Sequence, residues 1–132
     1  MHRLAAYLWT SPNTLLGLLL AAPDLLTRRH VRRVRGVLEI AGPWVGLLLR
    51  RGTLLKGGAR AITFGHVVLA VSPEALDQSR DHERVHVAQY ERWGPVFIAA
   101  YLVASLLAWA RGGDPYRDNR FEREAFGKTA GP

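Results

Sequence analysis

Residues 72–95 read SPEALDQSRDHERVHVAQYERWGP. The opening Ser72-Pro73-Glu74 supplies a capping hydroxyl, a proline suited to the first helical position, and a carboxylate at the positive end of the helix dipole. The closing Gly94-Pro95 pair is unfavourable for continuing a helix. The stretch therefore predicts one helix that runs to about Trp93.

The centre of this predicted helix is His82-Glu83-Arg84-Val85-His86, which has the pattern H-E-x-x-H. Residues four apart lie on one face of a helix, so both imidazoles can bind one metal ion. Zinc lowers the pKa of a bound water, and a neighbouring carboxylate can take its proton. We expect His82 and His86 to bind Zn²⁺ and Glu83 to act as the catalytic base. The structural alternative is a surface helix that carries two histidines on a charged face.

The third ligand of such a site has to come from another part of the chain. The chain has no cysteine, which excludes thiolate ligands and disulfides. A metzincin would have glycine and histidine at the positions that Gln89 and Arg92 occupy. We therefore expect a distal carboxylate, and the segment Asn119–Phe126 offers two, Glu122 and Glu124.

With its H-E-x-x-H helix and later glutamates, the stretch Ala61–Phe126 resembles short gluzincin zinc metallopeptidases, including the IrrE-like group. In these families a later helix supplies a Glu that is followed three residues later by Ala. Glu122 with Ala125 matches this spacing and Glu124 does not, so the resemblance implies Glu122 as the third zinc ligand. The families often have Asp or Asn directly after that Ala, where this chain has Phe126.

Other residues are candidates for lining the substrate cleft or for holding the ligating histidines in place. The ring nitrogen of a ligating histidine that does not bind the metal usually needs a hydrogen-bond partner. Gln89 lies one turn past the second histidine, a spacing that is similar to the His-x-x-Gln of small bacterial domains, and it can line the cleft or bond to backbone. Tyr116 can donate to an oxyanion or be an ordinary packed tyrosine. Asp118, Glu124 or a backbone carbonyl can serve as the histidine partner.

The segment Ala61–Val71 is the clearest strand of the chain, with Gly65 at a bulge or a close backbone approach. Zincin-like peptidases commonly bind an extended substrate along an edge strand beside the metal helix. The resemblance therefore implies a peptide that lies along this strand next to His66. The alternative is a core strand with a structural histidine.

The composition, 48% hydrophobic and 22% charged over 132 residues, predicts one globular domain over residues 1–132. We expect an α+β fold, a compact zincin-like domain with a small sheet, the H-E-x-x-H helix, an apolar helix and a C-terminal helix that bears Glu122. The other expected elements are a strand at Val34–Ile40, a short helix or strand at Trp44–Arg51, a turn at Lys56-Gly57-Gly58, the apolar helix at Val96–Ala110, a last helix or turn at Phe121–Phe126 and a tail at Gly127–Pro132.

Residues 1–33 are first apolar and then basic. Pro12 interrupts the apolar run Leu4–Ala22, which predicts two short helices that either pack on the core or lie in a membrane interface. The divided run does not fit a cleaved signal peptide, so secretion is not expected. A cluster of positive charge follows, which either is a solvated edge or contacts an anionic membrane surface: Arg28, Arg29, His30, Arg32, Arg33 and Arg35.

The apolar stretch Trp93–Ala110 would measure about 27 Å as a helix, close to the thickness of a bilayer core. His86 precedes it and Glu122 follows it, so a single crossing would put two ligands on opposite sides of the membrane. The connection Arg111–Phe121 is too short to recross as a helix. We therefore expect a buried or interfacial helix in a cytoplasmic or peripherally membrane-associated protein.

The expected function is that of a zinc-dependent hydrolase, a metallopeptidase acting on a peptide or protein substrate. The alternative is a non-catalytic metal-binding or membrane-associated interaction module on the same scaffold. The net charge of +7 also suits nucleic acid. However, aromatic residues do not interleave with the positive charges, and no nucleic-acid partner is expected.

Overall fold

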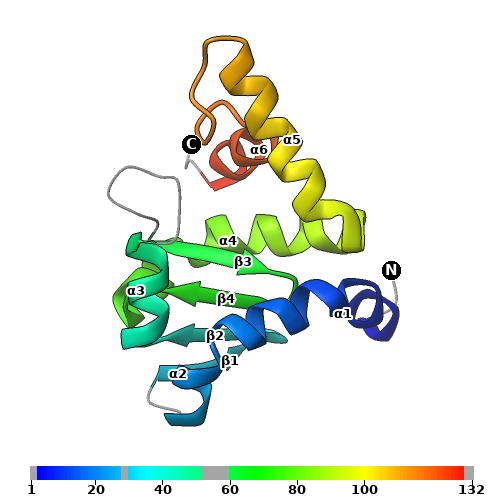
Figure 1. Ribbon diagram of the computed structural model, residues 1–132. Helices are drawn as coiled ribbons and strands as arrows, with labels where there is room; N and C mark the ends of the chain where they lie inside the picture. The colour runs from blue at the N-terminus through cyan, green and yellow to red at the C-terminus, as the bar shows by residue number, and fades with distance from the viewer. Residues whose placement is uncertain (1–2, 28–29, 52–59, 130–132) are drawn as a thin grey trace.

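A computed structural model describes residues 3–27, 30–51 and 60–129 of the chain (Figure 1). The fold is mixed helix and sheet, which confirms the predicted α+β class. The predicted turn at residues 56–58 and the first two arginines of the basic cluster lie outside the described residues. In chain order the elements are α1 (Arg3–Leu20), α2 (Ala22–Thr27), β1 (His30–Val34), β2 (Val37–Ala41), α3 (Pro43–Arg51), β3 (Ala61–Phe64), β4 (Val67–Ala70), α4 (Pro73–Trp93), the 3₁₀ turn η1 (Gly94–Val96), α5 (Phe97–Ala110) and α6 (Arg120–Thr129).

The four described strands form one mixed sheet in the order β1-β2-β4-β3. β1 with β2 and β3 with β4 are antiparallel hairpins, whereas β2 and β4 run parallel. The prediction of one strand at residues 34–40 was wrong in its start, because Arg35 and Gly36 turn the chain with φ angles of 49° and 78°. The basic segment at residues 30–34 is therefore an edge strand of the sheet.

The long strand predicted at residues 61–71 is also a hairpin. Gly65, with φ of 60°, starts the two-residue turn that separates β3 from β4, a conformation that glycine adopts without strain. A Cβ at this position would lie 2.4 Å from the Thr14 hydroxyl oxygen. His66 is the second turn residue, and the first strand of this hairpin, β3, lies at the edge of the sheet.

Helices cover both faces of the sheet, as the side chains of β4 show. Val67 and Leu69 belong to a cluster with α3 and the end of α1, whereas Val68 and Ala70 belong to a cluster with α4. Alternate residues of a strand point to opposite faces, so β4 is buried on both. In Figure 1, α4 lies behind the sheet and α1 and α3 lie in front of it.

Pro12 lies inside α1 and does not break it, contrary to the prediction of two short helices. Proline cannot donate the helical hydrogen bond to the carbonyl four residues earlier. That carbonyl, of Leu8, instead accepts a hydrogen bond of 2.8 Å from the Ser11 hydroxyl. Since the side chain replaces the missing donor, the helix continues through the proline. The segment predicted as a short helix or strand at residues 44–51 is the helix α3.

The predicted helix at residues 73–93 is confirmed as α4, and Ser72 caps it by accepting from the backbone N–H of Ala75. The chain then turns through η1 into α5, so that α5 and α6 lie on the side of α4 away from the sheet (Figure 1). Tyr90, Phe97 and Phe121 join these helices in a separate aromatic core. α6 is longer than predicted, because it continues to Thr129.

A buried carboxylate, Glu39 on β2, ties the sheet to α4. Its side chain is only 1% exposed and accepts two hydrogen bonds of 2.8 Å from Arg80 and one of 3.3 Å from Arg84. Burial raises the pKa of Glu39, but the hydrogen bonds and positive charges of the two arginines outweigh burial and hold it below its ordinary value. The ion pair therefore contributes stability that is present above the ordinary pKa and is lost as the pH falls through the lowered one.

We expect Glu39→Gln to lower the free energy of unfolding by about 3 kcal/mol at neutral pH, because it leaves two partly buried guanidinium groups without their buried carboxylate. The difference from wild type should shrink in acid, where Glu39 itself becomes protonated. Urea unfolding, monitored by circular dichroism at neutral and acidic pH, measures the difference in unfolding free energy and its dependence on pH. Asp81→Asn, a matched change of an exposed carboxylate on α4, is the control and should have little effect. Equal stability of the two variants at neutral pH would contradict this account.

Candidate metal centre

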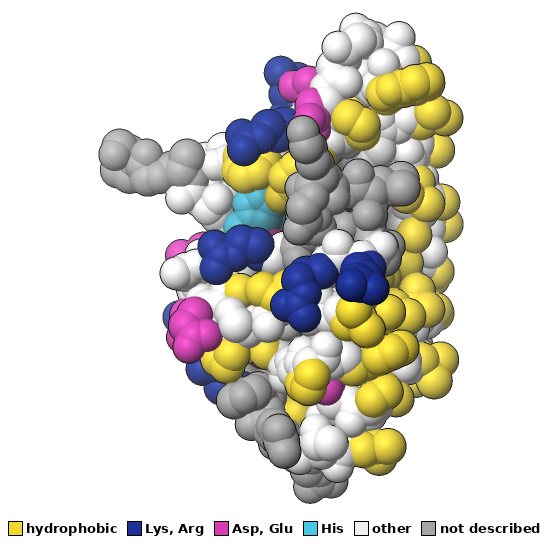
Figure 2. Space-filling model, turned by 60° about the vertical axis from the view of Figure 1, so that its left-hand side comes forward, with side chains coloured by type: hydrophobic (Ala, Val, Ile, Leu, Met, Phe, Trp, Pro, Cys, Tyr) yellow, Lys and Arg dark blue, Asp and Glu magenta, His cyan; other side chains and the backbone are white. Residues whose placement is uncertain are grey.

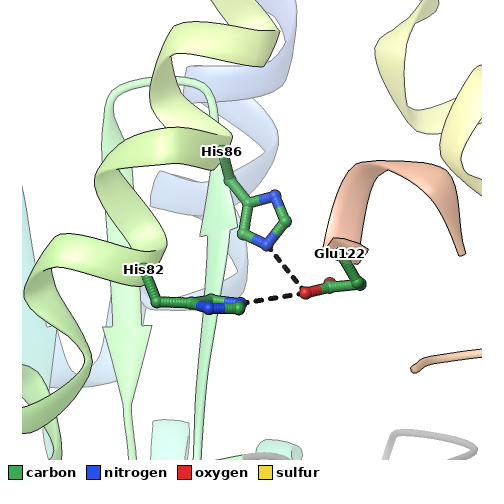
Figure 3. A group of neighbouring side chains, drawn as sticks. All are labelled: His82, His86 and Glu122. Carbon is green, nitrogen blue, oxygen red and sulfur yellow. Dashed lines mark hydrogen bonds and ion pairs between the residues drawn. The ribbon is translucent and has the colours of Figure 1, made fainter. Parts of the chain in front are cut away.

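His82, His86 and Glu122 meet in the structure, although the glutamate follows the second histidine by 36 positions (Figure 3). The Oε1 atom of Glu122 lies 2.9 Å from His82 Nε2 and 3.1 Å from His86 Nε2. One ligand atom from each residue lies within 4.8 Å of the other two. The two imidazoles project from successive turns of α4, and the carboxylate projects from the first turn of α6.

The start of α6 is fixed by Asn119, which is fully buried. Its Oδ1 atom accepts from the backbone N–H of Phe121 and so caps the helix. Its amide nitrogen donates to the Tyr101 carbonyl at 3.0 Å and to the Ser105 hydroxyl at 2.8 Å, both on α5. Asn119 therefore attaches α6 to α5 and sets the position of Glu122, a role that a single asparagine in the sequence does not reveal.

Gln89 orients the second histidine and connects α4 to α6. Its Oε1 atom lies 2.8 Å from His86 Nδ1, and its amide nitrogen donates to the Phe121 carbonyl and to Glu124. His86 Nδ1 must carry a proton to donate to Gln89, which in the neutral ring leaves Nε2 with a lone pair. That lone pair faces the Glu122 carboxylate, so the arrangement requires a proton or a metal cation between them.

The charges at the site agree with this requirement. Burial lowers the pKa of His86, but the carboxylates of Glu122 and Glu83 outweigh burial and raise it to about 9. Burial raises the pKa of Glu122, but hydrogen bonds from His82 and His86 outweigh it and lower the pKa to about 2. The pocket therefore favours positive charge next to an ionised carboxylate, and a divalent cation supplies such charge.

The donor set also fits Zn²⁺. Two imidazole nitrogens and one carboxylate oxygen are the ligands of many catalytic zinc sites, which leave a fourth position open. Bonds of that kind place tetrahedral ligand atoms about 3.3 Å apart. The carboxylate oxygen lies 2.9 and 3.1 Å from the two ring nitrogens, and all three atoms lie within 4.8 Å of one another, so a local rearrangement of these side chains would admit the ion.

Glu83 lies beside this group of donors and is 6% exposed. Its Oε1 atom accepts a hydrogen bond of 2.8 Å from the Thr63 hydroxyl on β3. Burial raises the pKa of Glu83 above its ordinary value, and the neighbouring imidazoles and Thr63 oppose the shift. A carboxyl with a raised pKa is suited to taking up a proton and giving it back.

Tyr101, on α5, is a site residue that the sequence did not identify. Its hydroxyl donates to Glu122 Oε2 at 2.5 Å, so the oxygen that does not face the histidines also has a partner. Burial and the Glu122 charge raise the pKa of Tyr101, which keeps the phenol protonated as a donor. The only signal in the sequence was its hydroxyl, which with that of Ser105 is one of two within an otherwise apolar helix.

The other predicted site residues have different surroundings. Glu124 accepts from Gln89 and Arg92 rather than joining the three donors. Tyr116 packs against the Phe126 ring, and burial together with the Glu122 and Glu83 charges raises its pKa. Its hydroxyl therefore stays protonated near the centre.

His66 is not one of the residues that meet here. Its Nδ1 lies 2.8 Å from the Thr10 hydroxyl on α1, and its Nε2 lies 2.8 Å from the Glu91 carboxylate. The edge of β3 is also partly occupied, because the Tyr90 hydroxyl donates to the Thr63 carbonyl. His66 therefore joins α1 to α4, and the expected peptide track beside it is interrupted.

Comparison with known proteins found no matching protein family, curated protein or solved structure.

Proposed function

We propose that the protein is a zinc-dependent hydrolase, and specifically a metallopeptidase of the gluzincin kind. The observation that carries the proposal is the meeting of His82, His86 and Glu122 around one point, with the Glu83 carboxylate beside them. In this proposal the first three residues bind Zn²⁺ and the fourth is the general base. The H-E-x-x-H spacing supports zinc over other divalent ions.

Bound zinc supplies a Lewis acid that lowers the pKa of water and polarises a carbonyl group. Glu83 takes a proton from the attacking water on its carboxylate and returns it to the departing amine. The Thr63 hydroxyl holds one carboxylate oxygen of Glu83, which leaves the other oxygen for this transfer. Gln89 keeps the His86 ring in the tautomer that offers Nε2 as a ligand.

The proposed substrate is a peptide or protein that reaches the site from solvent. His82 is partly exposed, with 14% of its side chain accessible. Figure 2 shows a patch of histidine at the surface beside basic side chains. β3, which holds Glu83 through Thr63, is an edge strand of the sheet. The carbonyl of Thr63 already has a partner, so an extended peptide can pair with only part of this edge.

Removal and return of the metal tests the proposal. Purified protein is expected to contain one equivalent of zinc by elemental analysis and to hydrolyse peptides from a mixed library, detected as new amino termini. A chelator should abolish both zinc content and hydrolysis, and added Zn²⁺ should restore them. Protein that binds no zinc even when the ion is supplied would contradict the proposal.

A further inference from the structure

α1 has an unusual orientation, because two of its polar residues point inward and five of its seven leucines are exposed, while only Leu18 and Leu20 pack on the core. Thr10 and Asn13 are buried and hydrogen-bonded, to His66 and to the Gly94 carbonyl respectively. The outward leucines include Leu8, 66% exposed, and Leu19, 73% exposed. Helices on the surface of water-soluble domains have the opposite arrangement, with the apolar side facing the core.

α5 continues this apolar surface. Its outward side includes Leu102 and Leu106, 60% and 61% exposed, while Phe97 and Ala104 on its other side are buried. The most apolar 18-residue window of the helical stretch that ends with α5 is long enough to cross a membrane, yet only 17% of it is buried. In Figure 2 hydrophobic side chains follow one whole side of the molecule.

α1 and α5 form one surface because α1 packs against η1, the turn from which α5 begins. The Trp9 ring of α1 lies against Gly94, where an added Cβ would come within 2.0 Å of the ring. The Asn13 amide donates to the carbonyl of the same glycine at 2.8 Å. We call the exposed residues of α1, η1 and α5 the apolar face: Leu4, Leu8, Trp9, Leu15, Leu16, Leu19, Val96, Leu102, Val103, Leu106, Leu107 and Trp109.

All four tryptophans of the chain are partly exposed, and two of them, Trp9 and Trp109, belong to the apolar face. Trp44 donates its indole N–H to the Leu20 carbonyl at the end of α1, and Trp93 directly precedes η1. Tryptophan is enriched where proteins meet the boundary between lipid and water. An outer surface that combines leucines with tryptophans therefore suits a bilayer.

Charge supplies a second, independent argument. Neither residues 4–23 nor residues 93–110 contain a charged side chain. A cavity of about 440 Å³ between α5 and α6 shares Val103 and Leu107 with the apolar face. It is also lined by Arg111, Arg120 and Arg123, against one acidic residue, Asp118. Positive charge beside an apolar surface suits a lipid that has an anionic head group.

We propose that the apolar face inserts into the outer part of an anionic lipid bilayer, with α1 and α5 lying in the membrane plane. The arginines beside α5 contact the anionic head groups. α5 does not span the bilayer, because Tyr101 on it donates to Glu122 and its buried side packs on α4 and α6. This inference is independent of the proposed hydrolase.

Vesicle flotation of the full chain tests the inference. The protein is expected to float with vesicles of equal parts phosphatidylcholine and phosphatidylglycerol, and much less with phosphatidylcholine alone or at high salt. Leu8→Glu and Leu106→Glu should each weaken binding at least about tenfold, since each removes a leucine from lipid. Gln78→Glu, which adds the same charge at an exposed position on α4, should bind as wild type does.

The measurement is made with and without a chelator, together with circular dichroism, so that loss of metal or of fold is detected separately from loss of lipid binding. Leu8 and Leu106 are exposed, and their substitution should leave the fold intact. Absence of flotation with either vesicle, or flotation that both glutamate variants retain, would overturn the inference. A stable dimer by light scattering that binds no vesicles would assign the apolar face to a second copy instead.

Discussion

Glu83→Gln is expected to reduce kcat/KM for peptide hydrolysis by at least about 100-fold while the protein keeps its zinc. Glutamine has nearly the same shape as glutamate, and its amide oxygen can still accept from the Thr63 hydroxyl. It cannot take a proton from water at neutral pH, so the base is lost. Glu83 is not one of the three donors that meet, so zinc content should not change.

The matched control is Glu74→Gln, the same chemical change at an exposed position in the first turn of α4. It should retain the wild-type rate. Two results would contradict the assignment of Glu83. If Glu83→Gln hydrolyses peptides at the wild-type rate, the activity belongs to another group or to a contaminant. If the wild-type protein binds zinc but hydrolyses no peptide, the non-catalytic metal-binding module becomes the better account.

Glu122→Ala is expected to weaken zinc binding by more than about 100-fold, whereas Glu124→Ala should weaken it by no more than about tenfold. Loss of a group that only supports a ligand typically costs 10- to 100-fold in metal affinity, so loss of the ligand itself should cost more. Glu122 faces both histidines, but Glu124 reaches the site only through Gln89. Competition with a zinc-binding dye measures the affinity for zinc, and elemental analysis measures the zinc content of the purified protein.

Glu122→Gln separates loss of the ligand from loss of the fold. The amide retains the shape of the side chain and can still accept from Tyr101, but it is a poor ligand for zinc. Both Glu122 variants should lose zinc with little change in circular dichroism. Retention of zinc by Glu122→Ala together with its loss in Glu124→Ala would assign the third ligand to the other carboxylate.

Local signals in the sequence predicted the parts of the fold that depend on neighbouring residues. Ser72 accepts the N–H of Ala75 as the capping pattern requires, and Gly94-Pro95 ends α4. The four-residue spacing of His82 and His86 places both rings on one side of that helix. These features follow from the geometry of a single helix and need no knowledge of the rest of the chain.

Other features could not be predicted, for different reasons. Propensity alone places a break at Pro12, because it does not include the hydrogen bond by which the neighbouring Ser11 hydroxyl supplies the missing donor. Tyr101 meets Glu122 only because η1 turns α5 back over α4, and the sequence does not give that angle. The segment at residues 61–71 read as one strand, since its β-branched residues continue on both sides of Gly65.

The separation in sequence between His86 and Glu122 gives a bound ion a mechanical role. An ion held by both residues, which are 36 positions apart, closes a loop that contains all of α5, so it acts as a reversible cross-link of the chain. Closing such a loop reduces the conformational entropy of the unfolded ensemble, and binding energy becomes folding energy. Loss of the ion should therefore release α5 and α6 before the sheet unfolds, with faster amide hydrogen exchange in those two helices.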